Sequence, residues 1–373
     1  MDFKEVQRIN WDCVVIGSGP AGSHLAYLLA NNGWKILVLE KNKIAGEKKA
    51  CGGAISTFLA NKLSINSIIG SKCKDIEIIF GNKCIRLKSE VPFILMIKRS
   101  EFDNYLINKA IKKGVIFLNH AYAIDVGKDA KVVCRQVRTN ELFKISGKYL
   151  VLADGAMTLG RKLGIGFCQE KQDNIKALKY DIRANDFRLG AKFIIDKEIM
   201  NPGYCWVFGK GEILNVGLGG FPCNNETSFN KMMKMFIGRY LAGIDISIVN
   251  CKGGIVPLQV AKKFASGKIL VVGDAAGLVN PMTGGGIHYA IKSAEIAAKL
   301  INKKLKMGAS EDLNAFNLKM KLNLYYLWLK IMRLIFLIFK RLRSYNGFFY
   351  YYFFIIYFRI FLISRRFIKL KLR

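Results

Sequence analysis

A glycine-rich segment near the start of the chain has the spacing of a phosphate-binding turn. Residues 17–22 read Gly-Ser-Gly-Pro-Ala-Gly and directly follow a short apolar run, Trp11–Ile16. In such a G-x-G-x-x-G turn the first glycine permits a tight bend, the second lets backbone N–H groups approach a diphosphate, and the third lets the next helix pack closely. The N–H groups and the dipole at the N-terminus of that helix favour an anion. We therefore expect Gly17, Gly19, Ala21 and Gly22 to bind the diphosphate of a dinucleotide.

An acidic residue closes the next apolar run, Lys35–Glu40. A carboxylate at the end of the second strand, about 20 residues beyond the glycines, accepts hydrogen bonds from the ribose of adenosine. The negative charge of Glu40 also disfavours a 2′-phosphate, so NADP is not expected in this site. The order of strand, turn, helix and second strand favours a nucleotide site over a merely structural turn.

A second glycine-rich segment lies late in the chain. Residues 272–277 read Val-Gly-Asp-Ala-Ala-Gly after a buried-strand pattern at 268–272, and residues 284–286 are three glycines that open an apolar-periodic helix through Leu300. Binding of NAD alone does not need this segment. In an FAD site, an Asp at the strand end can bind the ribityl hydroxyls, and the glycines lie beneath the diphosphate or the flavin ring. We therefore expect FAD, in contact with Asp274, Gly285, Gly286 and Ile287.

The elements that must position these residues form an α/β pattern. The chain opens β-α-β, and a helix that starts at Ser100 separates short β-like pieces at 75–97 from a β-rich stretch at 115–152. Residues 175–256 hold further candidate elements, which we interpret as a sheet that covers the substrate. These elements are the strands Ile175–Ile182, Gly203–Phe208 and Glu212–Leu218 and the helix Ser228–Tyr240.

The predicted fold class is α/β, with a Rossmann-like FAD-binding domain, an inserted β-rich substrate domain and C-terminal amphipathic helices. The FAD-binding domain is expected to be discontinuous and to comprise residues 1–165 with 252–306. The β-rich domain would span residues 166–251, and a C-terminal helical region would span 307–373.

Several short motifs within residues 10–300 resemble the geranylgeranyl reductase family of the para-hydroxybenzoate-hydroxylase-like flavoproteins. Residues 49–53 (Lys-Ala-Cys-Gly-Gly) and 202–208 (Pro-Gly-Tyr-Cys-Trp-Val-Phe) match elements particular to that family. The chain departs from the family pattern at Gly209, where proline is usual, and this departure bears on the substrate rather than on the cofactor. Residues 98–103 also match. The matches shared by the wider flavoprotein group, which specify only the cofactor, are residues 17–22, 153–156 and 273–287.

The resemblance implies roles for the matching residues around the cofactor. Cys51 and Gly52, followed by Ala54, would lie beside the isoalloxazine ring, where small residues permit close approach. Arg99 would hold FAD near its ribose or phosphates. Ala123 would contact the adenine through its backbone, and Asp154 would belong to a second cofactor turn.

The same resemblance implies a lipid pocket lined by Gly53, Tyr204 and Trp206. The two aromatic residues alternate on a candidate strand and so face one side. As bare patterns, alternate aromatic residues fit an ordinary core equally well, and a single Cys is more often a small core residue than a reactive one. With the resemblance, Cys51 and Tyr204 become the candidate proton donors.

The net charge and the cysteine pattern limit which partners and which cellular compartment the protein can have. The formal net charge of +32 favours an anionic partner, although an enrichment in Asn, Ile, Lys, Phe and Tyr fits a general compositional bias equally well. The nine cysteines include no CxxC pair, and no secretory signal precedes the first strand. We therefore expect a cytoplasmic, reduced protein. No metal site is expected, since His24, His120 and His288 have no ligand spacing. No nucleic-acid partner is expected either.

The C-terminal tail differs in charge from the rest of the chain, because no Asp or Glu follows Asp312 and its charged residues are all basic. Lys330, Arg333 and Lys340 fall on one helical face among apolar residues, and Arg359, Arg366, Lys369 and Arg373 repeat the spacing. The apolar run Phe348–Phe358 is shorter than the roughly 20 residues that span a bilayer. A peripheral helix at the membrane interface is therefore preferred over the wall of an internal tunnel, and a transmembrane hairpin is the least favoured reading.

Three functions fit these expectations. The first is an FAD-dependent reductase of C=C bonds in geranylgeranyl or other polyprenyl groups, which needs an external electron donor such as a ferredoxin-like carrier or NAD(P)H. The second is a flavin-dependent monooxygenase or halogenase on the same scaffold. The third is a membrane-docked flavin electron carrier without an organic substrate.

Overall fold

The computed structural model describes residues 3–47, 49–167, 174–184, 190–222, 228–308, 312–342, 348, 351–357 and 369–372. The chain divides into two compact units. The first unit contains Met1–Lys48, Ser100–Asn174 and Val256–Arg333, and the second contains Lys49–Arg99, Ile175–Ile255 and Leu334–Arg373. The grouping of Lys49–Arg99 with the second unit was not anticipated from the sequence, and the domain boundaries expected above remain a proposal.

The first unit is built on a mainly parallel sheet with the strand order β17-β18-β11-β1-β2-β8. Strand β1 lies in its interior, parallel to both β2 and β11, and every residue of β1 is buried, as is typical of a sheet covered on both faces. Strands β9 and β10 extend β11 in antiparallel pairing. The strand bounds are β1 Trp11–Ile16, β2 Ile36–Leu39, β8 Ile116–Leu118, β9 Ala121–Val126, β10 Lys131–Gln136, β11 Leu142–Leu152, β17 Ala265–Ser266 and β18 Ile269–Val271.

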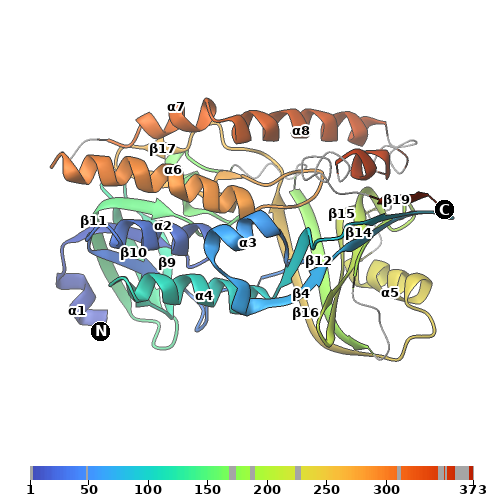
Figure 1. Cartoon of the computed structure of the whole chain (residues 1–373). Helices are drawn as coiled ribbons and strands as arrows, with labels where there is room; N and C mark the ends of the chain where they lie inside the picture. Colours follow the sequence, from blue (N-terminus) through green and yellow to red (C-terminus); the bar gives the residue numbers. More distant parts are fainter. Residues whose placement is uncertain are drawn as a thin grey trace. The chain divides into compact units, whose positions relative to one another are not determined.

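Helices pack on this sheet in the order expected for a doubly wound fold. The chain leaves β1 through α2 (Pro20–Ala30) toward β2, while β11 and β18 lie on the other side of β1, so the direction of winding reverses at β1. Helix α6 (Ile287–Lys306) runs beside α2 (Figure 1). The sequence prediction of a Rossmann-like domain is confirmed. The other helical segments of this part are α1 Phe3–Arg8, α4 Arg99–Ile111, η2 Leu159–Leu163, η3 Gly273–Ala276 and α7 Ala315–Lys321.

The second unit is built on another eight-stranded sheet, with the strand order β16-β12-β15-β14-β13-β5-β6-β19. Its strands are β5 Asp75–Phe80, β6 Lys83–Lys88, β12 Asn174–Ala184, β13 Ala191–Ile195, β14 Met200–Lys210, β15 Ile213–Pro222, β16 Ile246–Pro257 and β19 Lys369–Leu372. A small sheet, β3-β7-β4, comprises Ala54–Ser56, Ile94–Ile97 and Ile69–Cys73. The short helical segments are α3 Thr57–Leu63, η1 Asn66–Ile68 and α5 Phe229–Tyr240.

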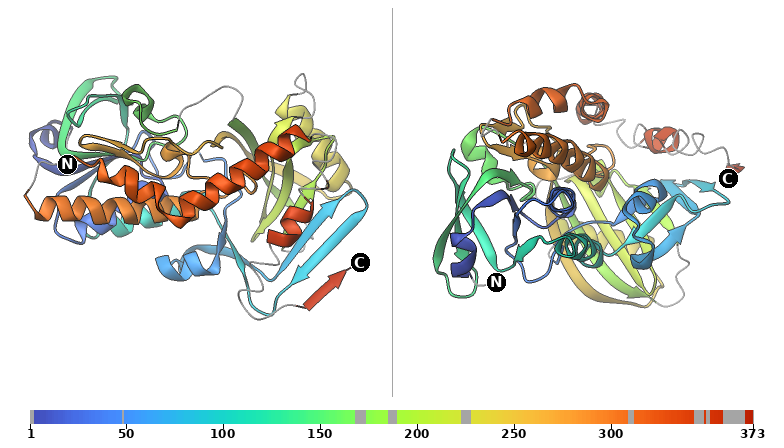
Figure 2. Two further views of the ribbon diagram at one scale, coloured as in Figure 1. Left: turned by 90° about the horizontal axis from the view of Figure 1, so that it is seen from above. Right: turned by 60° about the vertical axis from the view of Figure 1, so that its left-hand side comes forward.

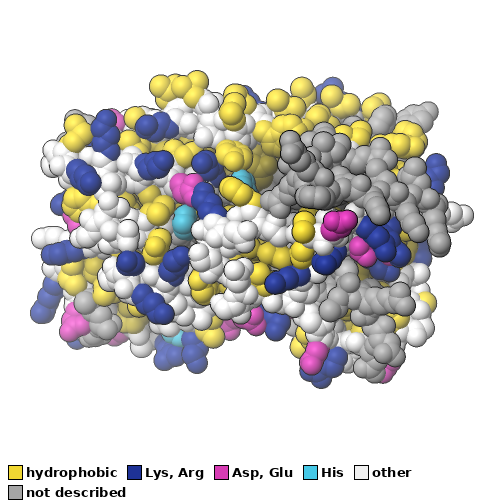
Figure 3. Space-filling model, in the orientation of Figure 1, with side chains coloured by type: hydrophobic (Ala, Val, Ile, Leu, Met, Phe, Trp, Pro, Cys, Tyr) yellow, Lys and Arg dark blue, Asp and Glu magenta, His cyan; other side chains and the backbone are white. Residues whose placement is uncertain are grey.

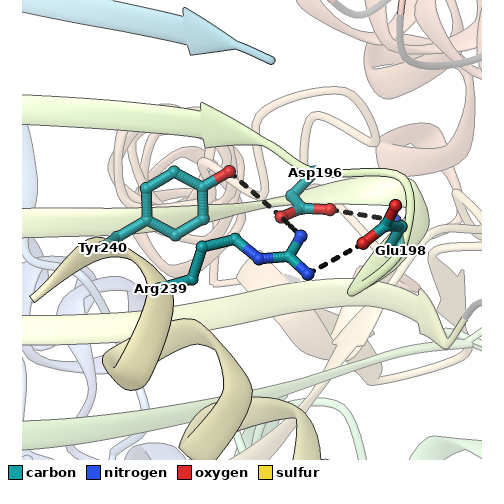
Figure 4. Close-up of polar contacts among 4 residues, drawn as sticks. All are labelled: Asp196, Glu198, Arg239 and Tyr240. Carbon is teal, nitrogen blue, oxygen red and sulfur yellow. Dashed lines mark hydrogen bonds and ion pairs between the residues drawn. The ribbon is translucent and has the colours of Figure 1, made fainter. Parts of the chain in front are cut away.

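Helix α5 is fastened to the sheet of the second unit by a buried acidic group (Figure 4). Arg239 donates to Asp196 and to Glu198 at 2.6 and 2.8 Å, and the Tyr240 hydroxyl lies 3.0 Å from the same oxygen of Asp196. The Ser228 side chain caps the first turn of α5 by accepting from Lys231 N–H. These contacts explain why the predicted helix Ser228–Tyr240 forms where the sequence placed it.

The C-terminal chain differs from the expected run of helices at one place. Residues 369–372 form β19, which pairs antiparallel with β6 (Figure 2). The expectation that Lys369 continues a helical spacing is therefore wrong, because the alternation Lys-Leu-Lys-Leu at 369–372 has the period of a strand. Arg359, Arg366 and Arg373 of that expected helix lie outside the described residues.

Helix α8 (Leu324–Arg341) has two apolar faces. On the buried face, Tyr326 packs on Phe264 and Phe336 packs on Phe221, with ring centroids 5.6 and 6.1 Å apart. The opposite face leaves large side chains in solvent, and Figure 3 shows hydrophobic side chains gathered over α7 and α8. No helix in the described part of the chain is both long and apolar enough to cross a membrane. The solvent-exposed face, with one residue just beyond the helix end, is called the outer stripe and comprises Leu324, Leu327, Trp328, Ile331, Leu334, Ile338 and Leu342.

Candidate active site

The turn at residues 17–22 joins the carboxyl end of β1 to α2. Gly17 has a φ of +99°, and a Cβ there would overlap the carbonyl oxygen of Ala153, just as a Cβ at Gly22 would overlap that of Gly17. Gly19 is different, because its φ of −69° and ψ of −178° suit any residue and no described atom beyond its chain neighbours lies within 4 Å of its Cβ position. No side chain caps α2 at Gly19. Open space beside uncapped N–H groups fits a diphosphate.

Glu40 holds this turn from the end of β2. Its carboxylate is 8% exposed and accepts from the Ser18 backbone N–H and hydroxyl at 3.1 and 2.7 Å. The other oxygen accepts from the backbone and side-chain N–H groups of Asn42 at 3.0 and 2.8 Å. A carboxylate accepts about four hydrogen bonds. A ribose hydroxyl that binds Glu40 would therefore replace one of these donors.

The second glycine-rich segment converges on the first within the same unit. Gly273 has a φ of +62°, and its Cβ position is 3.1 Å from Cβ of Ala21 and 3.4 Å from Cβ of Ala290, which places it between α2 and α6. Gly286 is the N-cap of α6, where no side chain caps the helix, and its Cβ position is 3.0 Å from Asp274 Oδ1. Two uncapped helix N-termini on glycine turns fit the extended dinucleotide FAD, which would be held by residues of both segments.

A buried amide beside the glycines escaped the sequence analysis. Asn280 is 2% exposed, its Oδ1 accepts from Met282 N–H at 2.9 Å, and its backbone pairs with Gly284 and Gly285. Its Nδ2 has no hydrogen-bond acceptor among the described residues. A buried donor of this kind is normally satisfied, so Asn280 is a candidate cofactor contact. No motif marks it, because an Asn before a Gly-rich stretch reads as an ordinary turn residue.

The remaining cofactor candidates come from three other parts of the chain. Asp154 borders it directly, since its Cα is 3.2 Å from the Cβ position of Gly17, and its Oδ2 accepts from Leu159 N–H at 2.8 Å. Ala123 is a buried residue of β9. Arg99 begins α4 and falls in the second unit by contacts.

An aromatic row lies on one face of β14 in the second unit. Tyr204, Trp206 and Phe208 are alternate residues of the strand. The ring centroid of Trp206 lies 5.9 Å from that of Tyr204 and 6.2 Å from that of Phe208. Phe193 packs against Tyr204 and Phe208 at 5.8 and 5.1 Å, and Phe354 lies 5.2 Å from Tyr204. The expectation that Tyr204 and Trp206 face one side is confirmed.

Trp206 is fixed by both a hydrogen bond and a glycine. Its Nε1 donates to Asn215 Oδ1 at 2.8 Å, and Asn215 Nδ2 donates to Asp181 Oδ1 at 2.8 Å. A Cβ at Gly217 would overlap the indole ring, so the neighbouring strand must carry glycine there. The indole therefore has one orientation in the row.

The Cys-Gly-Gly segment lies against this aromatic row. The Cβ position of Gly52 is 2.8 Å from the Phe208 ring and 3.5 Å from Trp206 Nε1. Gly53 has a φ of +71° and donates its N–H to Cys51 Sγ at 3.3 Å. The two motifs particular to the family, far apart in sequence, thus come together within one unit.

Lys210, at the end of β14, is a second residue that the sequence analysis missed. It is 5% exposed, and its Nζ is 2.5 Å from the Cβ position of Gly53. Burial lowers the pKa of Lys210 to about 8. Burial, and after it the charge of a Cys51 thiolate, raise the pKa of Tyr204 above its usual value, which makes that phenol a weaker acid. Among the described residues no group of three or more His, Cys, Asp or Glu is arranged to hold a metal ion.

Comparison of the sequence with known proteins agrees with the glycine turns of the first unit and with the Cys-Gly-Gly segment and aromatic row of the second. The sequence model of the pyridine nucleotide-disulphide oxidoreductase family matches residues 11–192. The chain is 32% identical over 324 residues to the digeranylgeranylglycerophospholipid reductase of Thermoplasma acidophilum, covering 79% of each protein. It is 30% identical over 319 residues to the geranylgeranyl diphosphate reductase of Rhodobacter capsulatus, covering 82% of this chain and 78% of that protein.

A solved structure supports the same assignment. The crystal structure of a geranylgeranyl bacteriochlorophyll reductase-like protein from Thermoplasma acidophilum superposes with a TM-score of 0.77 and 26% identity, covering 91% of both chains. The fold, the paired glycine turns and the identity to curated reductases agree. The chain belongs to the geranylgeranyl reductase family of FAD-dependent oxidoreductases.

Proposed function

We propose that this protein saturates C=C bonds of geranylgeranyl or related polyprenyl chains in lipid biosynthesis. The observation that carries the proposal is the packing of Gly52, within the segment Cys51-Gly52-Gly53, against Phe208 and Trp206, because it joins small, close-approach residues to an aromatic surface. The names of the relatives at 30% and 32% identity support a geranylgeranyl substrate. An external electron donor is needed, and a ferredoxin-like carrier or NAD(P)H would serve.

Residues of both units would bind the cofactor that such a reaction needs. FAD, once bound and reduced, supplies the hydride. Gly17, Gly19 and Gly22 with the N-terminus of α2 would bind its diphosphate, and Glu40 would hold the adenosine ribose. Cys51 and Gly52, which the resemblance assigns to the flavin ring, belong to the second unit.

The aromatic row would bind and orient the prenyl chain. An isolated alkene has no polar group to anchor, so it must be held by apolar contact and by alignment. The faces of Trp206, Tyr204 and Phe208 also stabilise positive charge that develops on carbon. Cys51 is the proposed proton donor, because the raised pKa of Tyr204 leaves its proton more tightly bound.

One anaerobic assay tests the proposal. The purified protein, reduced by dithionite, is given geranylgeranyl lipids, and the products are analysed by mass spectrometry. A gain of two hydrogen atoms for each reduced bond supports it. Product that forms only with oxygen would favour a monooxygenase or halogenase, and reoxidation by a carrier without any change in lipid would favour an electron carrier. Either result contradicts the reductase.

We also propose that the protein binds the cytoplasmic membrane surface peripherally through α8. The outer stripe exposes Leu324 and Leu334 to 79% and 61%, and Lys330 and Arg341 flank it on the same helix. Apolar side chains beside basic ones suit the interface of a bilayer with anionic lipid.

Replacing Ile331 with glutamate should weaken binding to anionic vesicles by at least about tenfold. Ile331 is 51% exposed on the outer stripe, and loss of its burial in lipid costs about 1.5–3 kcal/mol before any charge repulsion. Co-sedimentation with phosphatidylglycerol vesicles measures the change. Leu142→Glu is the matched control, because Leu142 is 66% exposed on β11. Equal binding of both variants would refute docking through α8.

A further inference from the structure

A buried lysine next to the Cys-Gly-Gly segment has no role in the function proposed so far. The side chain of Lys210 leaves the end of β14 beside the small sheet, with its Cβ 3.7 Å from the Cβ position of Gly70 on β4. Its Nζ reaches the Cβ position of Gly53. Only a residue without a side chain at position 53 leaves room for this ammonium group.

The charge of Lys210 is not neutralised by a direct partner. Asp181 is a carboxylate that acts on Lys210 electrostatically, but both of its oxygens are engaged, by Asn215 Nδ2 at 2.8 Å and by Lys179 Nζ at 2.6 Å. No hydrogen bond to Lys210 Nζ occurs within the described residues, and the atom keeps some contact with solvent. An ammonium on a side chain that is only 5% exposed is still costly without a partner, so its retention calls for a purpose.

Cys51 is the group beside Lys210 that can supply a negative charge. Its Sγ accepts from the N–H of Gly53, the same residue whose Cβ position lies against Lys210 Nζ. Cys51 is also the first of the charged groups that act on Lys210, ahead of Lys179, Asp181 and Arg99. Tyr204 also interacts electrostatically with Cys51, and its raised pKa keeps it neutral.

We infer that Lys210 is the proton partner of Cys51, a positioning residue that returns a proton to the sulfur after the thiol has protonated the substrate. In one turnover the S–H bond breaks as a C–H bond forms on the alkene. An N–H bond of Lys210 then breaks as the S–H bond re-forms, and solvent reprotonates the amine. This relay moves protons only, because the two electrons that enter the alkene arrive with the hydride from reduced FAD. The role of Lys210 therefore rests on the proposed function.

The pair can be observed without any prenyl substrate. The holoprotein is treated with iodoacetamide between pH 6 and 10, and alkylation of Cys51 is quantified by peptide mass spectrometry. In Lys210→Met the pH midpoint for Cys51 alkylation should rise by about one unit or more, because a neighbouring positive charge favours the thiolate. In Lys210→Arg the midpoint should stay at or below that of the wild type. Alkylation of the exposed Cys251 is the internal reference and should not change.

Turnover gives a second readout. Because the relay needs the ammonium form, the reduction rate should fall as the pH rises through about 8, and in Lys210→Arg this decline should move to higher pH. An unchanged Cys51 midpoint in Lys210→Met, with flavin still bound, would overturn the pairing. A shifted midpoint in a protein that reduces no prenyl lipid would uphold the pairing and overturn the proposed function. Should Lys210→Met fail to fold, the arginine variant decides, since a midpoint raised above that of the wild type contradicts the pairing.

Discussion

Replacing Gly19 with valine is expected to leave the apoprotein folded and to weaken FAD binding by at least about a hundredfold, equivalent to about 2.7 kcal/mol. The backbone at Gly19 is extended, and no described atom outside its chain neighbours lies within 4 Å of its Cβ position. Valine therefore meets little protein, and its poorer capping of α2 costs no more than about 1 kcal/mol. Its methyl groups instead fill the space at the N-terminus of α2 that a diphosphate needs.

Flavin absorbance after gel filtration and the thermal unfolding midpoint of the apoprotein measure the two effects separately. Gly238→Val is a suitable control, because Gly238 on α5 also has open space at its Cβ position and lies on the second unit. That variant should keep its full flavin content. If Gly19→Val retained tightly bound flavin, the diphosphate would not bind at this turn.

Replacing Gly53 with alanine should lower kcat/KM for prenyl reduction by at least about a hundredfold. The residue has a φ of +71°, and a Cβ would overlap the carbonyl oxygen of Ile97 and meet Lys210 Nζ at 2.5 Å. The carbonyl belongs to strand β7 and cannot move freely, so the segment that carries Cys51 must shift. A displacement of about 1 Å in a positioning element is enough to cost about a hundredfold in rate.

Gly81→Ala separates this displacement from backbone strain. Gly81 has a φ of +55° in the turn between β5 and β6, and nothing lies within 4 Å of its Cβ position. Both variants bear the cost of a left-handed alanine, about 1–2 kcal/mol. Comparable activity in Gly53→Ala and Gly81→Ala, measured by single-turnover reduction, would show that the Cys-Gly-Gly conformation is not needed for the reaction.

The parts of the fold governed by local chemistry could be predicted from the sequence. The turn at 17–22, the strand Trp11–Ile16 and the helix after Gly286 follow from glycine spacing and apolar periodicity within a few residues, and the structure contains all three. The convergence of the two glycine segments was expected because an FAD site uses both, and Gly273 between α2 and α6 explains it physically.

What could not be predicted depends on pairing between distant strands. Strand β5 pairs in parallel with β13, more than a hundred residues later, and this pairing assigns Lys49–Arg99 to the second unit. Lys210 was overlooked for the same reason. A lysine at the end of a strand reads as exposed, and only the register of β14 beside the small sheet buries it.

The three-dimensional structure also explains what glycine does at position 209, where the family usually has proline. Its backbone N–H donates to the carbonyl of Gly190 at 3.1 Å, and its carbonyl accepts from the Ser71 hydroxyl. Proline has no N–H to donate, so the family's usual residue could not make the first bond. The chain thus has its own attachment at the end of β14, one residue before Lys210.

The interleaving of the two units along the chain has a consequence for biosynthesis. Strand β1 needs β11, and β11 needs β18, so the sheet of the first unit lacks a strand until residue 271 has left the ribosome. Such non-local pairing slows folding and leaves apolar edges uncovered during translation. Chaperone dependence of the nascent chain, and failure of fragments ending before β18 to accumulate in cells, are the expected costs of this topology.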